Sequence, residues 1–437
     1  MKKNLRSTPE GTRDLLFEES IARREAESTL SDLFLCRGFS EVMTPGMEYY
    51  DLFEGGGHPI LPSEDMYKLT DGKGRLLVMR PDSTMPIARL TATRLKNAPL
   101  PVRLYYMQDV FHMNHGMTGH NDQVFQAGIE MIGAAGERAD LEVIALAADS
   151  LRQCGVENFR IEIGHVGFFH SLVEELAVDE ETRDAIRTAI ETKNYTALGD
   201  VLDGLPVSES ADAIRRLPRL FGGEEVLKAA APLCRGEQTR RALSYLQGLY
   251  KKLCELGLQD QVMIDLGLVH RNEYYTGVIF RGYIEGSGDT VISGGRYDAL
   301  LSRFGADLPA TGFGVNVDSL TRVMLAGGEV DPPMPPEILV HAQKGYETAA
   351  LKKVGELCGE GILCEYSVFE TLEEAQEYAA GRCISQVFSV GRDIEVFEIY
   401  RPRAGEAKFL QKNGDSYETD THRPDQRAAG KGHGSAV

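Results

Sequence analysis

Residues 111–130 read FHMNHGMTGHNDQVFQAGIE, and this stretch decides how the whole chain is interpreted. The apolar run at 101–111 predicts a buried strand before it, and the run at 124–133 predicts a second strand after a polar loop. Gln126 and Glu130 are four residues apart on the second strand, so both side chains lie on the same face. A carboxylate that faces a cavity is costly unless a cation or hydrogen-bond donors meet it. Both residues therefore indicate a cationic ligand group, and polar residues satisfied inside the core are the alternative.

Composition and charge limit the classes of protein that fit. The chain has 437 residues, 42% of them hydrophobic and 26% charged, which predicts two or three globular domains. The sequence has no run of eighteen apolar residues and no apolar stretch behind its basic start, so we expect neither a membrane span nor a secretory signal. The net charge of −19 favours small molecules or protein partners over a long run of tRNA phosphates.

The seven cysteines are scattered along the chain and form no CxxC pair. This usage indicates reduced thiols in a cytoplasmic protein. Cys358 and Cys364 are the pair closest in sequence, and a zinc or redox role there is the less favoured interpretation.

The first 330 residues read as one large domain of strands and helices, with residues 170–258 as a helical insertion because they hold few strand signals. The other helices are expected at 16–37, 87–96, 138–153 and after 316. The strands are expected within 38–48, 101–111, 124–133, 160–169, 261–269, 276–284, 289–295 and 310–316. A hairpin is expected to turn at Asp71-Gly72-Lys73-Gly74.

The Pro-rich stretch DPPMPPE at 331–337 predicts a linker between domains. Beyond it, strand and helix patterns alternate over 338–420, which predicts a small α/β domain with a partly parallel sheet. Asn413-Gly414 is typical of a hairpin turn near the end of this domain. The small and polar residues 421–437 are expected to form a disordered tail.

Seven short motifs follow one another in order between residues 8 and 325. They are PEGTRD at 9–14, Gly38-Phe39 through Thr44-Pro45 to Glu48, RPDST at 80–84, the loop up to Glu130, EYYTG at 273–277, GGRYD at 294–298 and GFG at 312–314. Each motif alone is a weak signal, but seven in this order resemble histidyl-tRNA synthetase, a class II aminoacyl-tRNA synthetase. The resemblance implies the fold of that family, an α+β domain with an antiparallel sheet flanked by helices.

The chain differs from that family at the positions that matter most for synthetase chemistry. Joining a carboxylate to the α-phosphate of ATP develops negative charge, which fixed guanidinium groups stabilise. The resemblance places three such arginines of the family at His112, His270 and Ser319, and an acidic residue of its loop at Asn114. We therefore predict that the adenylation chemistry is lost and that the chain has no catalytic residue. Arg271 follows His270 directly, and a local shift that turns it inward stays open.

The positions that hold the amino-acid ligand match the family much better. The resemblance implies a histidine-like ligand site formed by Asp82, Thr84, Gln126, Glu130, Tyr274, Tyr275 and Tyr297. Asp82 stands where the family has glutamate, and the loss of one methylene leaves the ligand's identity open. The tyrosine pairs at 105–106 and 274–275 are also typical of packing residues.

Two other patterns in the sequence are weaker. His112, His115 and His120 lie on one loop, but this loop offers no carboxylate scaffold, so we predict no metal site there. The triplet at 55–57 is Gly-Gly-Gly, but it lacks the strand-to-helix context of a dinucleotide-binding loop.

A histidyl-synthetase-like body without these arginines is similar to the regulatory subunit of ATP phosphoribosyltransferase, which acts in the first step of histidine biosynthesis. The resemblance implies a protein without chemistry or cofactor of its own that stimulates a short catalytic subunit and takes part in feedback inhibition by histidine. It also implies a homodimer through residues 38–50 within a hetero-oligomer. The C-terminal segment matches an anticodon-binding domain only loosely, so tRNA binding is not expected. Two alternatives stay open: a divergent active histidyl-tRNA synthetase and a free-standing histidine sensor.

Overall fold

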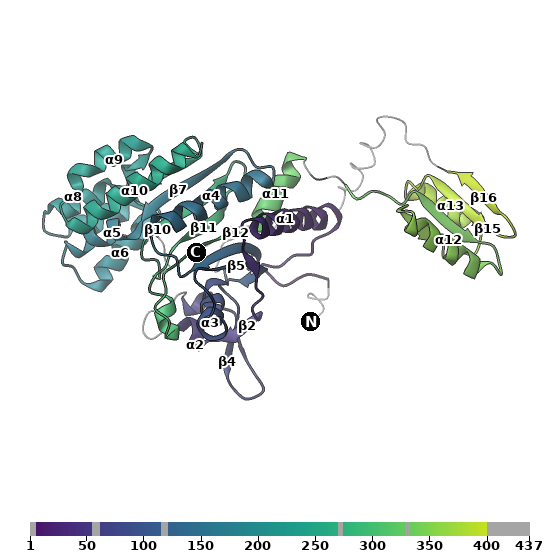
Figure 1. Cartoon of the computed structure of the whole chain (residues 1–437), viewed down its shortest axis with the longest axis horizontal. Coiled ribbons are helices and arrows are strands. Elements are labelled where there is room, and N and C mark those ends of the chain that lie inside the picture. The colour runs from purple at the N-terminus through teal and green to yellow at the C-terminus, as the bar shows by residue number, and fades with distance from the viewer. Residues whose placement is uncertain are drawn as a thin grey trace, which may run out of the picture. The chain divides into compact units, whose positions relative to one another are not determined.

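The computed structural model divides the chain into two compact units, residues 1–332 and 333–437 (Figure 1). It describes residues 6–54, 62–114, 121–269, 274–328, 330 and 332–399. The turn expected at Asn413-Gly414, the tail 421–437 and the glycines 55–57 lie outside the described residues. Among the helices described, none combines the length and the apolar character needed to cross a membrane.

A nine-stranded sheet forms the centre of the first unit, in the order β1-β5-β6-β12-β11-β10-β7-β9-β8. The strands are β1 Ser40–Glu41, β5 Val102–Phe111, β6 Gln123–Ile132, β7 Phe159–His165, β8 Phe221–Gly222, β9 Val262–Asp265, β10 Val278–Ile284, β11 Thr290–Arg296 and β12 Ala310–Asn316. Neighbouring strands are antiparallel except in the pairs β1–β5 and β7–β9. The mainly antiparallel sheet with helices on its faces confirms the predicted α+β class.

The stretch at 111–130 becomes the end of β5, a loop and the start of β6, and the two strands pair along all ten of their residues. The alternation of a strand sends Ala127, Ile129 and Met131 to one face, where they join the larger hydrophobic core. Three helices cover that face: α1 Phe17–Cys36, α4 Glu137–Gln153 and α11 Val317–Gly327 (Figure 1). Gln126 and Glu130 therefore lie on the opposite face, where the site is built.

A smaller layer lies under the opposite face of the sheet. It contains α2 Asp51–Glu54, α3 Thr84–Arg94 and a three-stranded sheet of β2 Met47–Tyr49, β4 Leu76–Met79 and β3 Lys68–Thr70. The predicted turn at 71–74 joins β3 and β4, with the Gly74 amide donating to the Asp71 carbonyl at 3.0 Å. Gly74 has a φ of +79°, a conformation that glycine adopts without strain.

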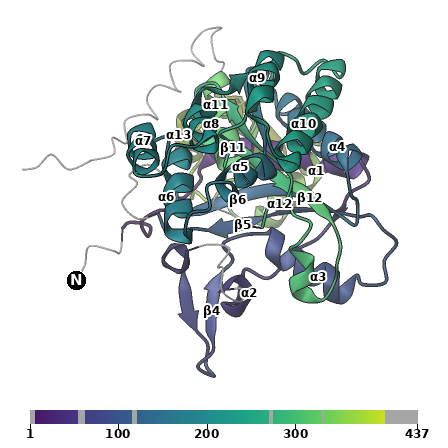
Figure 2. The ribbon, with the colours of Figure 1, turned by 90° about the vertical axis from the view of Figure 1, so that its left-hand side faces the viewer.

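Six helices form the insertion between β7 and β9, and Figure 2 shows them on the viewer's side of the sheet. They are α5 Val166–Glu174, α6 Glu180–Glu191, α7 Tyr195–Asp203, α8 Glu209–Arg216, α9 Glu224–Ala230 and α10 Glu237–Glu255. The strand predicted over 160–169 was too long, because its last four residues start α5. The reason is local: His165 Nδ1 accepts a hydrogen bond from the Gly167 amide at 3.1 Å and so caps the helix. Short 3₁₀ helices occupy Ser63–Asp65, Leu217–Arg219, Ala231–Leu233 and Leu301–Phe304.

The second unit contains a four-stranded sheet in the order β14-β13-β15-β16. Its elements are β13 Ile338–Ala342, α12 Glu347–Gly359, β14 Cys364–Tyr366, α13 Leu372–Gly381, β15 Gln386–Val390 and β16 Ile394–Glu398. The pairs β13–β14 and β13–β15 are parallel, whereas β15–β16 is antiparallel, as the alternating pattern predicted. Alternate residues of β13 face two separate clusters, with Val340 toward α12 and Leu339 toward α13.

Candidate functional site

A cavity of about 820 Å³, called the main cavity below, lies on the face of the sheet opposite α1 and α4. All seven residues predicted to hold a ligand line it: Asp82, Thr84, Gln126, Glu130, Tyr274, Tyr275 and Tyr297. They come from α3 and its approach, from β6, and from the segments that flank β10 and β11. Residues spread over more than two hundred positions of the sequence therefore meet in one place.

Glu130 is the most deeply buried acidic group of the main cavity, with 2% of its surface exposed. Thr84 Oγ1 donates a hydrogen bond to Glu130 Oε1 at 2.6 Å, and the Tyr297 hydroxyl donates to Oε2. Among the described residues, no Lys or Arg forms an ion pair with this carboxylate. Burial is the main reason why the pKa of Glu130 rises to about 8, because the charged form is poorly solvated there.

Strand β12 makes room for the two polar residues of β6. Gly312 pairs with Glu130, and a Cβ at position 312 would lie 2.0 Å from Glu130 Oε2. A Cβ at Gly314 would likewise lie 2.6 Å from Gln126 Nε2. Phe313 between them points into the core on the other face of the sheet. The two glycines of the GFG motif thus leave the space that the side chains of Gln126 and Glu130 occupy.

Tyr106 is a site residue that the sequence interpretation missed, because the pair 105–106 was assigned to packing. Its hydroxyl donates to Gln126 Oε1 at 2.9 Å, and its ring lines the main cavity. Tyr105 does face the other side, where its hydroxyl lies 3.0 Å from Ser31 Oγ. Strand register could have separated the two tyrosines, since Tyr106 pairs with Gly128 on the face that carries Gln126.

Asp82 has a structural role as well as a place in the cavity wall. Its Oδ1 accepts a hydrogen bond from the Met85 amide at 2.9 Å, in the first turn of α3. Burial raises the pKa of Asp82 to about 6. The Asp82 carboxyl group therefore orients the start of α3. Its presence alone is not evidence for a ligand.

The three tyrosines form an aromatic wall of the main cavity. The ring centroids of Tyr274 and Tyr275 lie 4.7 Å apart, and those of Tyr274 and Tyr297 lie 5.7 Å apart in an edge-to-face arrangement. Burial is the main cause that raises the pKa of each of the three hydroxyls, so all three stay protonated donors at neutral pH. The three tyrosines thus pack against one another and line the cavity at the same time.

At the loop end of the cavity, the described lining residues include no Lys or Arg, the side chains expected of a phosphate site. His112 lines the cavity, and burial lowers its pKa, so the imidazole is neutral near pH 7. Asn114 Nδ2 donates to Asp122 Oδ1 at 3.1 Å across the base of the loop. The Asp122 amide donates to the Gly11 carbonyl at 2.7 Å, which fastens the N-terminal PEGTRD motif to the same place. A Cβ at Gly11 would lie 2.3 Å from the Asp122 carboxyl carbon, so this contact requires glycine.

Ser319 lies beside the main cavity and does not line it. It lies in an adjoining hollow of about 330 Å³, which shares Asn121 and Val124 with the main cavity. Ser319 Oγ donates to Asp289 Oδ2 at 3.1 Å. Arg322, one helical turn further along α11, lies 3.4 Å from the same carboxylate and was missed in the sequence. The predicted positions His115, His120, His270 and Arg271 lie outside the described residues.

The charge of the main cavity is strongly one-sided. Five carboxyl side chains line it: Glu64, Asp65, Asp82, Glu130 and Glu191. Among the described residues that line it, none is Lys or Arg. Glu191 is the last residue of α6, so the helical insertion contributes to the wall, which no local sequence signal indicated. Such a lining attracts cations and disfavours a polyphosphate.

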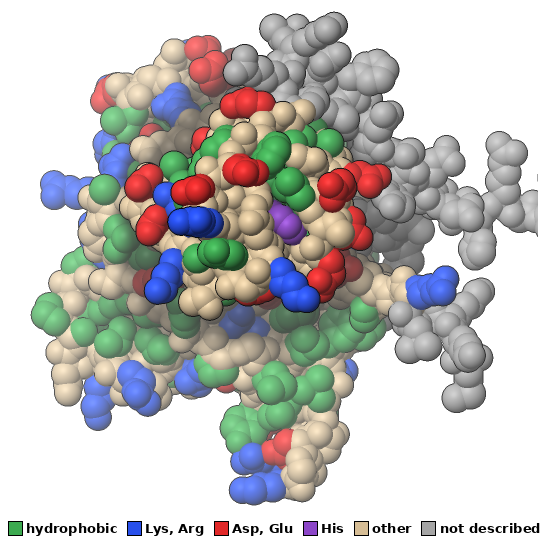
Figure 3. All heavy atoms as spheres, turned by 90° about the vertical axis from the view of Figure 1, so that its right-hand side faces the viewer, with side chains coloured by type: hydrophobic (Ala, Val, Ile, Leu, Met, Phe, Trp, Pro, Cys, Tyr) green, Lys and Arg blue, Asp and Glu red, His purple; other side chains and the backbone are tan. Residues whose placement is uncertain are grey.

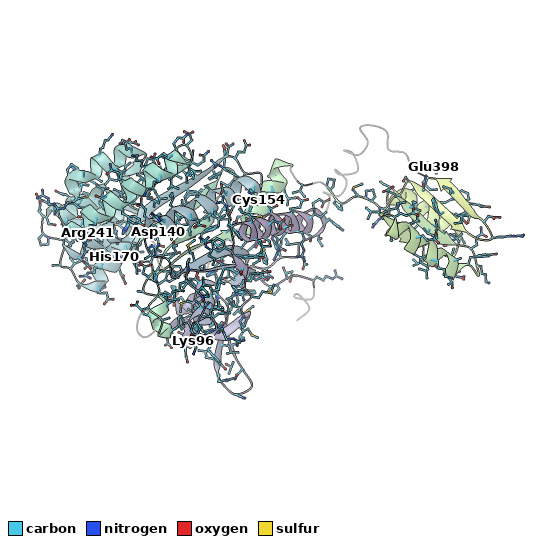
Figure 4. The ribbon with its side chains drawn as sticks, in the orientation of Figure 1. Lys96, Asp140, Cys154, His170, Arg241 and Glu398 are labelled. Atoms are coloured by element: carbon cyan, nitrogen blue, oxygen red, sulfur yellow. The ribbon has the colours of Figure 1, made fainter. Side chains whose placement is uncertain are left out.

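Two arginines of the shared motifs are present but serve the fold. Arg80 is buried and donates to the backbone carbonyls of Thr44 and Asp109 at 2.8 and 2.6 Å. Arg296 donates to both carboxylate oxygens of Asp140, at 3.0 and 2.7 Å. Asp140, labelled in Figure 4, also accepts a hydrogen bond from Tyr245 of the insertion. Neither arginine lines the main cavity.

A metal site finds no support in the part of the chain that the structure describes. No group of three or more His, Cys, Asp and Glu side chains there is arranged to hold an ion.

Comparison with known proteins gives consistent matches over most of the chain. The family model described as histidyl-tRNA synthetase matches residues 11–320. An ATP phosphoribosyltransferase regulatory subunit of Clostridium kluyveri is 39% identical over 374 residues, covering 85% of this chain and 95% of that protein. One of Bacillus mycoides is 34% identical over 419 residues, covering 95% and 98%.

Solved structures show the same likeness. A structure described as an ATP phosphoribosyltransferase regulatory subunit/histidyl-tRNA synthetase from Bacillus halodurans has a TM-score of 0.75 and 30% identity, covering 86% of this chain and 96% of that chain. Histidyl-tRNA synthetase from Nostoc sp. PCC 7120 has a TM-score of 0.70 at 20% identity, covering 93% and 99%, and shows the fold alone. The class II synthetase-like architecture expected from the seven motifs is thereby confirmed.

Proposed function

Because the chain belongs to the family of ATP phosphoribosyltransferase regulatory subunits, which share the histidyl-tRNA synthetase fold, we propose how it works in that role. It carries out no adenylation, and it activates a short catalytic chain in the first step of histidine biosynthesis. It also senses histidine through the main cavity and takes part in feedback inhibition.

The observation that carries the proposal is the buried Glu130 in an acidic lining whose described residues include no Lys or Arg. A carboxylate that burial holds near a pKa of 8 gains from a ligand cation that replaces its proton. The ammonium group of an amino acid is such a cation, and the hydroxyls of Thr84 and Tyr297 fix the carboxylate that would receive it. The aromatic wall of tyrosines suits an imidazole ring beside the ammonium group.

The same lining argues against ATP chemistry. Adenylation brings two anions together, and positive charge has to offset the charge that develops at the α-phosphate. The family positions for this charge hold His112, His270 and Ser319, and the first of these is a neutral imidazole. Each lost charged hydrogen bond costs about 1.5–3 kcal/mol, so three together would slow the step by up to about a million-fold. Those of the five carboxyl groups in the wall that are ionised add repulsion to this loss.

The homodimer of this proposal uses residues 38–50 and the small sheet next to them. The apolar side chains of Met43, Met47 and Tyr49 are largely exposed, at 74%, 55% and 47%. Figure 3 shows apolar surface at the lower end of the first unit, where this sheet lies. An apolar face of this kind is typical of a surface that another protein subunit covers.

Binding of tRNA is not part of the proposal. Residues 333–399 carry twelve Asp and Glu against five Lys and Arg, and Figure 3 shows acidic side chains over the second unit. A surface that neutralises phosphates would instead gather basic side chains. We place the assembly in the cytoplasm, which agrees with seven cysteines that are all free thiols.

A mixed assay tests the proposal. Short-form ATP phosphoribosyltransferase is measured alone, with this protein, and with this protein plus histidine. We expect a higher rate when this protein is added and a lower rate again when histidine is added. A rate that does not respond to this protein would contradict the proposal and favour a free-standing histidine sensor.

A second measurement separates the proposal from a divergent synthetase. Histidine-dependent exchange between ATP and pyrophosphate is followed with the pure protein, with an active histidyl-tRNA synthetase as the positive control. We expect no exchange above background. Clear exchange would mean that the missing arginines have been replaced, for instance by Arg271.

A further inference from the structure

Two cysteines of the second unit lie in sulfur contact although they are not bonded. Cys358 Sγ and Cys364 Sγ are 3.6 Å apart. Cys358 lies in the last turn of α12 and is exposed, whereas Cys364 is the first residue of β14 and is partly buried. Five residues separate them, so the two sulfurs lie at the two ends of a short loop.

The loop between the two cysteines has a defined backbone. Gly361 adopts a φ of +81°, and its amide donates to the Cys358 carbonyl at 3.0 Å. The Ile362 amide donates to the Leu357 carbonyl, also at 3.0 Å, and both side chains join the same hydrophobic cluster. This pattern is the Schellman motif, which ends a helix and fixes the direction of the chain after it. The approach of the two sulfurs is therefore a consequence of how α12 ends.

The second sulfur is fixed from the sheet side. Cys364 pairs with Ile338 of the central strand β13. Its thiol donates a hydrogen bond to the Val354 carbonyl of α12 at 3.7 Å. Because the helix holds one sulfur and the sheet holds the other, little chain freedom is lost when the two are joined.

We propose that Cys358 and Cys364 are a redox modification site that forms a reversible intramolecular disulfide with a low-molecular-weight disulfide as the oxidant. The Cys358 thiolate attacks one sulfur of the oxidant, which forms a mixed disulfide and releases one small thiolate. The Cys364 thiolate then attacks the Cys358 sulfur, which forms the internal disulfide and releases the second small thiolate. Two thiol protons pass to the released thiolates, and two electrons reduce the oxidant to two thiols.

The two cysteines have different roles in this exchange. Cys358 is the accessible partner and therefore meets the oxidant first. Burial and the neighbouring Cys358 raise the pKa of Cys364 to about 11, so it is a poor first nucleophile. Its proximity to the mixed disulfide makes the second step intramolecular, with an effective concentration of about millimolar or more.

The disulfide would fasten a weak edge of the second unit. Strand β14 has three residues and stands at the end of the sheet, where β13 is its only neighbour among the described strands. A covalent link to the last turn of α12 holds this edge strand in place and restricts the unfolded chain. We therefore expect the oxidised protein to unfold at a higher temperature than the reduced protein.

Intact-mass analysis of the full-length protein tests the proposal. Reduced protein is incubated with oxidised glutathione, free thiols are blocked, and the disulfide is located by peptide mapping. We expect loss of two hydrogen masses, a Cys358–Cys364 peptide, and return of both thiols after treatment with dithiothreitol. A lasting glutathione adduct at Cys358, or a disulfide with any other cysteine, would overturn the proposal.

Substitutions make the test specific. Cys358→Ser and Cys364→Ser each abolish the internal disulfide, and Cys364→Ser leaves a stable glutathione adduct at Cys358. Cys36→Ser, at another exposed cysteine, and Cys383→Ser, in the same unit, leave it unchanged. Gly361→Ala strains the loop and slows the second step, the attack of Cys364 on the mixed disulfide. Hydrogen exchange on the folded protein shows whether this slower step comes from the loop or from unfolding of the unit. If oxidation leaves the midpoint of thermal unfolding unchanged, the claim that the disulfide stabilises β14 is wrong.

Discussion

Asp140 and Glu130 are both carboxyl groups inside the first unit, with 0% and 2% of their surface exposed, but their surroundings differ. Asp140 receives two hydrogen bonds from Arg296, so its charge is met by the protein itself. Glu130 receives hydrogen bonds from two neutral hydroxyls, and its pKa rises to about 8. The first carboxylate holds the sheet to α4, whereas the second pairs with no Lys or Arg among the described residues, so a ligand could supply its cation.

The same contrast explains which motif residues the chain shares with histidyl-tRNA synthetase. Arg80 and Arg296 hold backbone and carboxyl groups together, so their loss would damage the fold. His112, where the resemblance places an arginine of the family, instead lines the main cavity. A motif residue can thus be kept for structural reasons, so the site has to be judged by the residues that face the cavity.

The largest expected effect is the loss of stability when Asp140 loses its partner Arg296. Arg296→Ala leaves a buried carboxylate without its cation, which costs about 3–5 kcal/mol of unfolding free energy. Urea unfolding of the variant measures this loss. Arg322→Ala is the matched control, because that arginine is half exposed and its ion pair is expected to contribute less than about 1 kcal/mol. Equal losses in the two variants would contradict the structural role of Arg296.

The second effect concerns the ligand side of the comparison. Glu130→Gln keeps the shape and removes the negative charge, so we expect histidine to bind about ten- to a hundred-fold more weakly, because a charged hydrogen bond contributes about 1.5–3 kcal/mol. Isothermal titration calorimetry gives the Kd. Glu162→Gln is the control, since Glu162 is also a buried carboxyl with a raised pKa but does not line the main cavity. Unchanged affinity in Glu130→Gln would mean that the pocket does not bind through this carboxylate.

A third test moves Glu130 without replacing it. Gly312→Ala places a Cβ against Glu130 Oε2 and the Ile129 carbonyl, at 2.0 and 2.3 Å, so the strands or the side chain must shift. We expect a loss of about 1–3 kcal/mol in stability and weaker histidine binding. Gly355→Ala in α12 meets no atom within 4 Å and is expected to gain about 0.5–1 kcal/mol instead. A neutral effect at Gly312 would show that the carboxylate is not held against this strand.

The smallest effect, taken over a single pH unit, is the pH dependence that follows from the raised pKa of Glu130. The folded, ligand-free protein keeps the proton up to about pH 8, whereas the unfolded chain loses it near 4.5. The stability from this group is therefore fully present below pH 4.5 and is lost as the pH rises through 8, by up to about 1.4 kcal/mol per unit. The Glu130→Gln variant should lack this slope in a series of thermal melts.

Ligand affinity should change in the opposite direction. A cation binds the ionised carboxylate, so histidine affinity rises by up to about tenfold per unit between pH 6 and 8. Histidine's own imidazole titrates near 6.5 and affects wild type and variant alike, so the difference between them isolates Glu130. Equal slopes would contradict proton release from this residue.

Much of the site could be predicted because it depends on local patterns. The alternation of β6 placed Gln126 and Glu130 on one face, and the resemblance to histidyl-tRNA synthetase grouped them with Thr84 and Tyr297, which line the same cavity. The start of α5 after His165 was missed because the apolar run there also fits a strand. The hydrogen bond from the Gly167 amide to the His165 side chain starts the helix instead. Tyr106 was missed because which member of a tyrosine pair faces a cavity depends on strand register.

The sequence by itself determined the class of fold, the family and the polar face of β6, because periodicity and motif order are properties of the chain. The tertiary structure decided which carboxyl groups are matched by cations, since Asp140 and Arg296 are 156 residues apart. It also placed Glu191 of the insertion in the cavity wall and Ser319 in an adjoining hollow. Charge compensation acts through space over a few ångströms, and only the folded chain defines those distances.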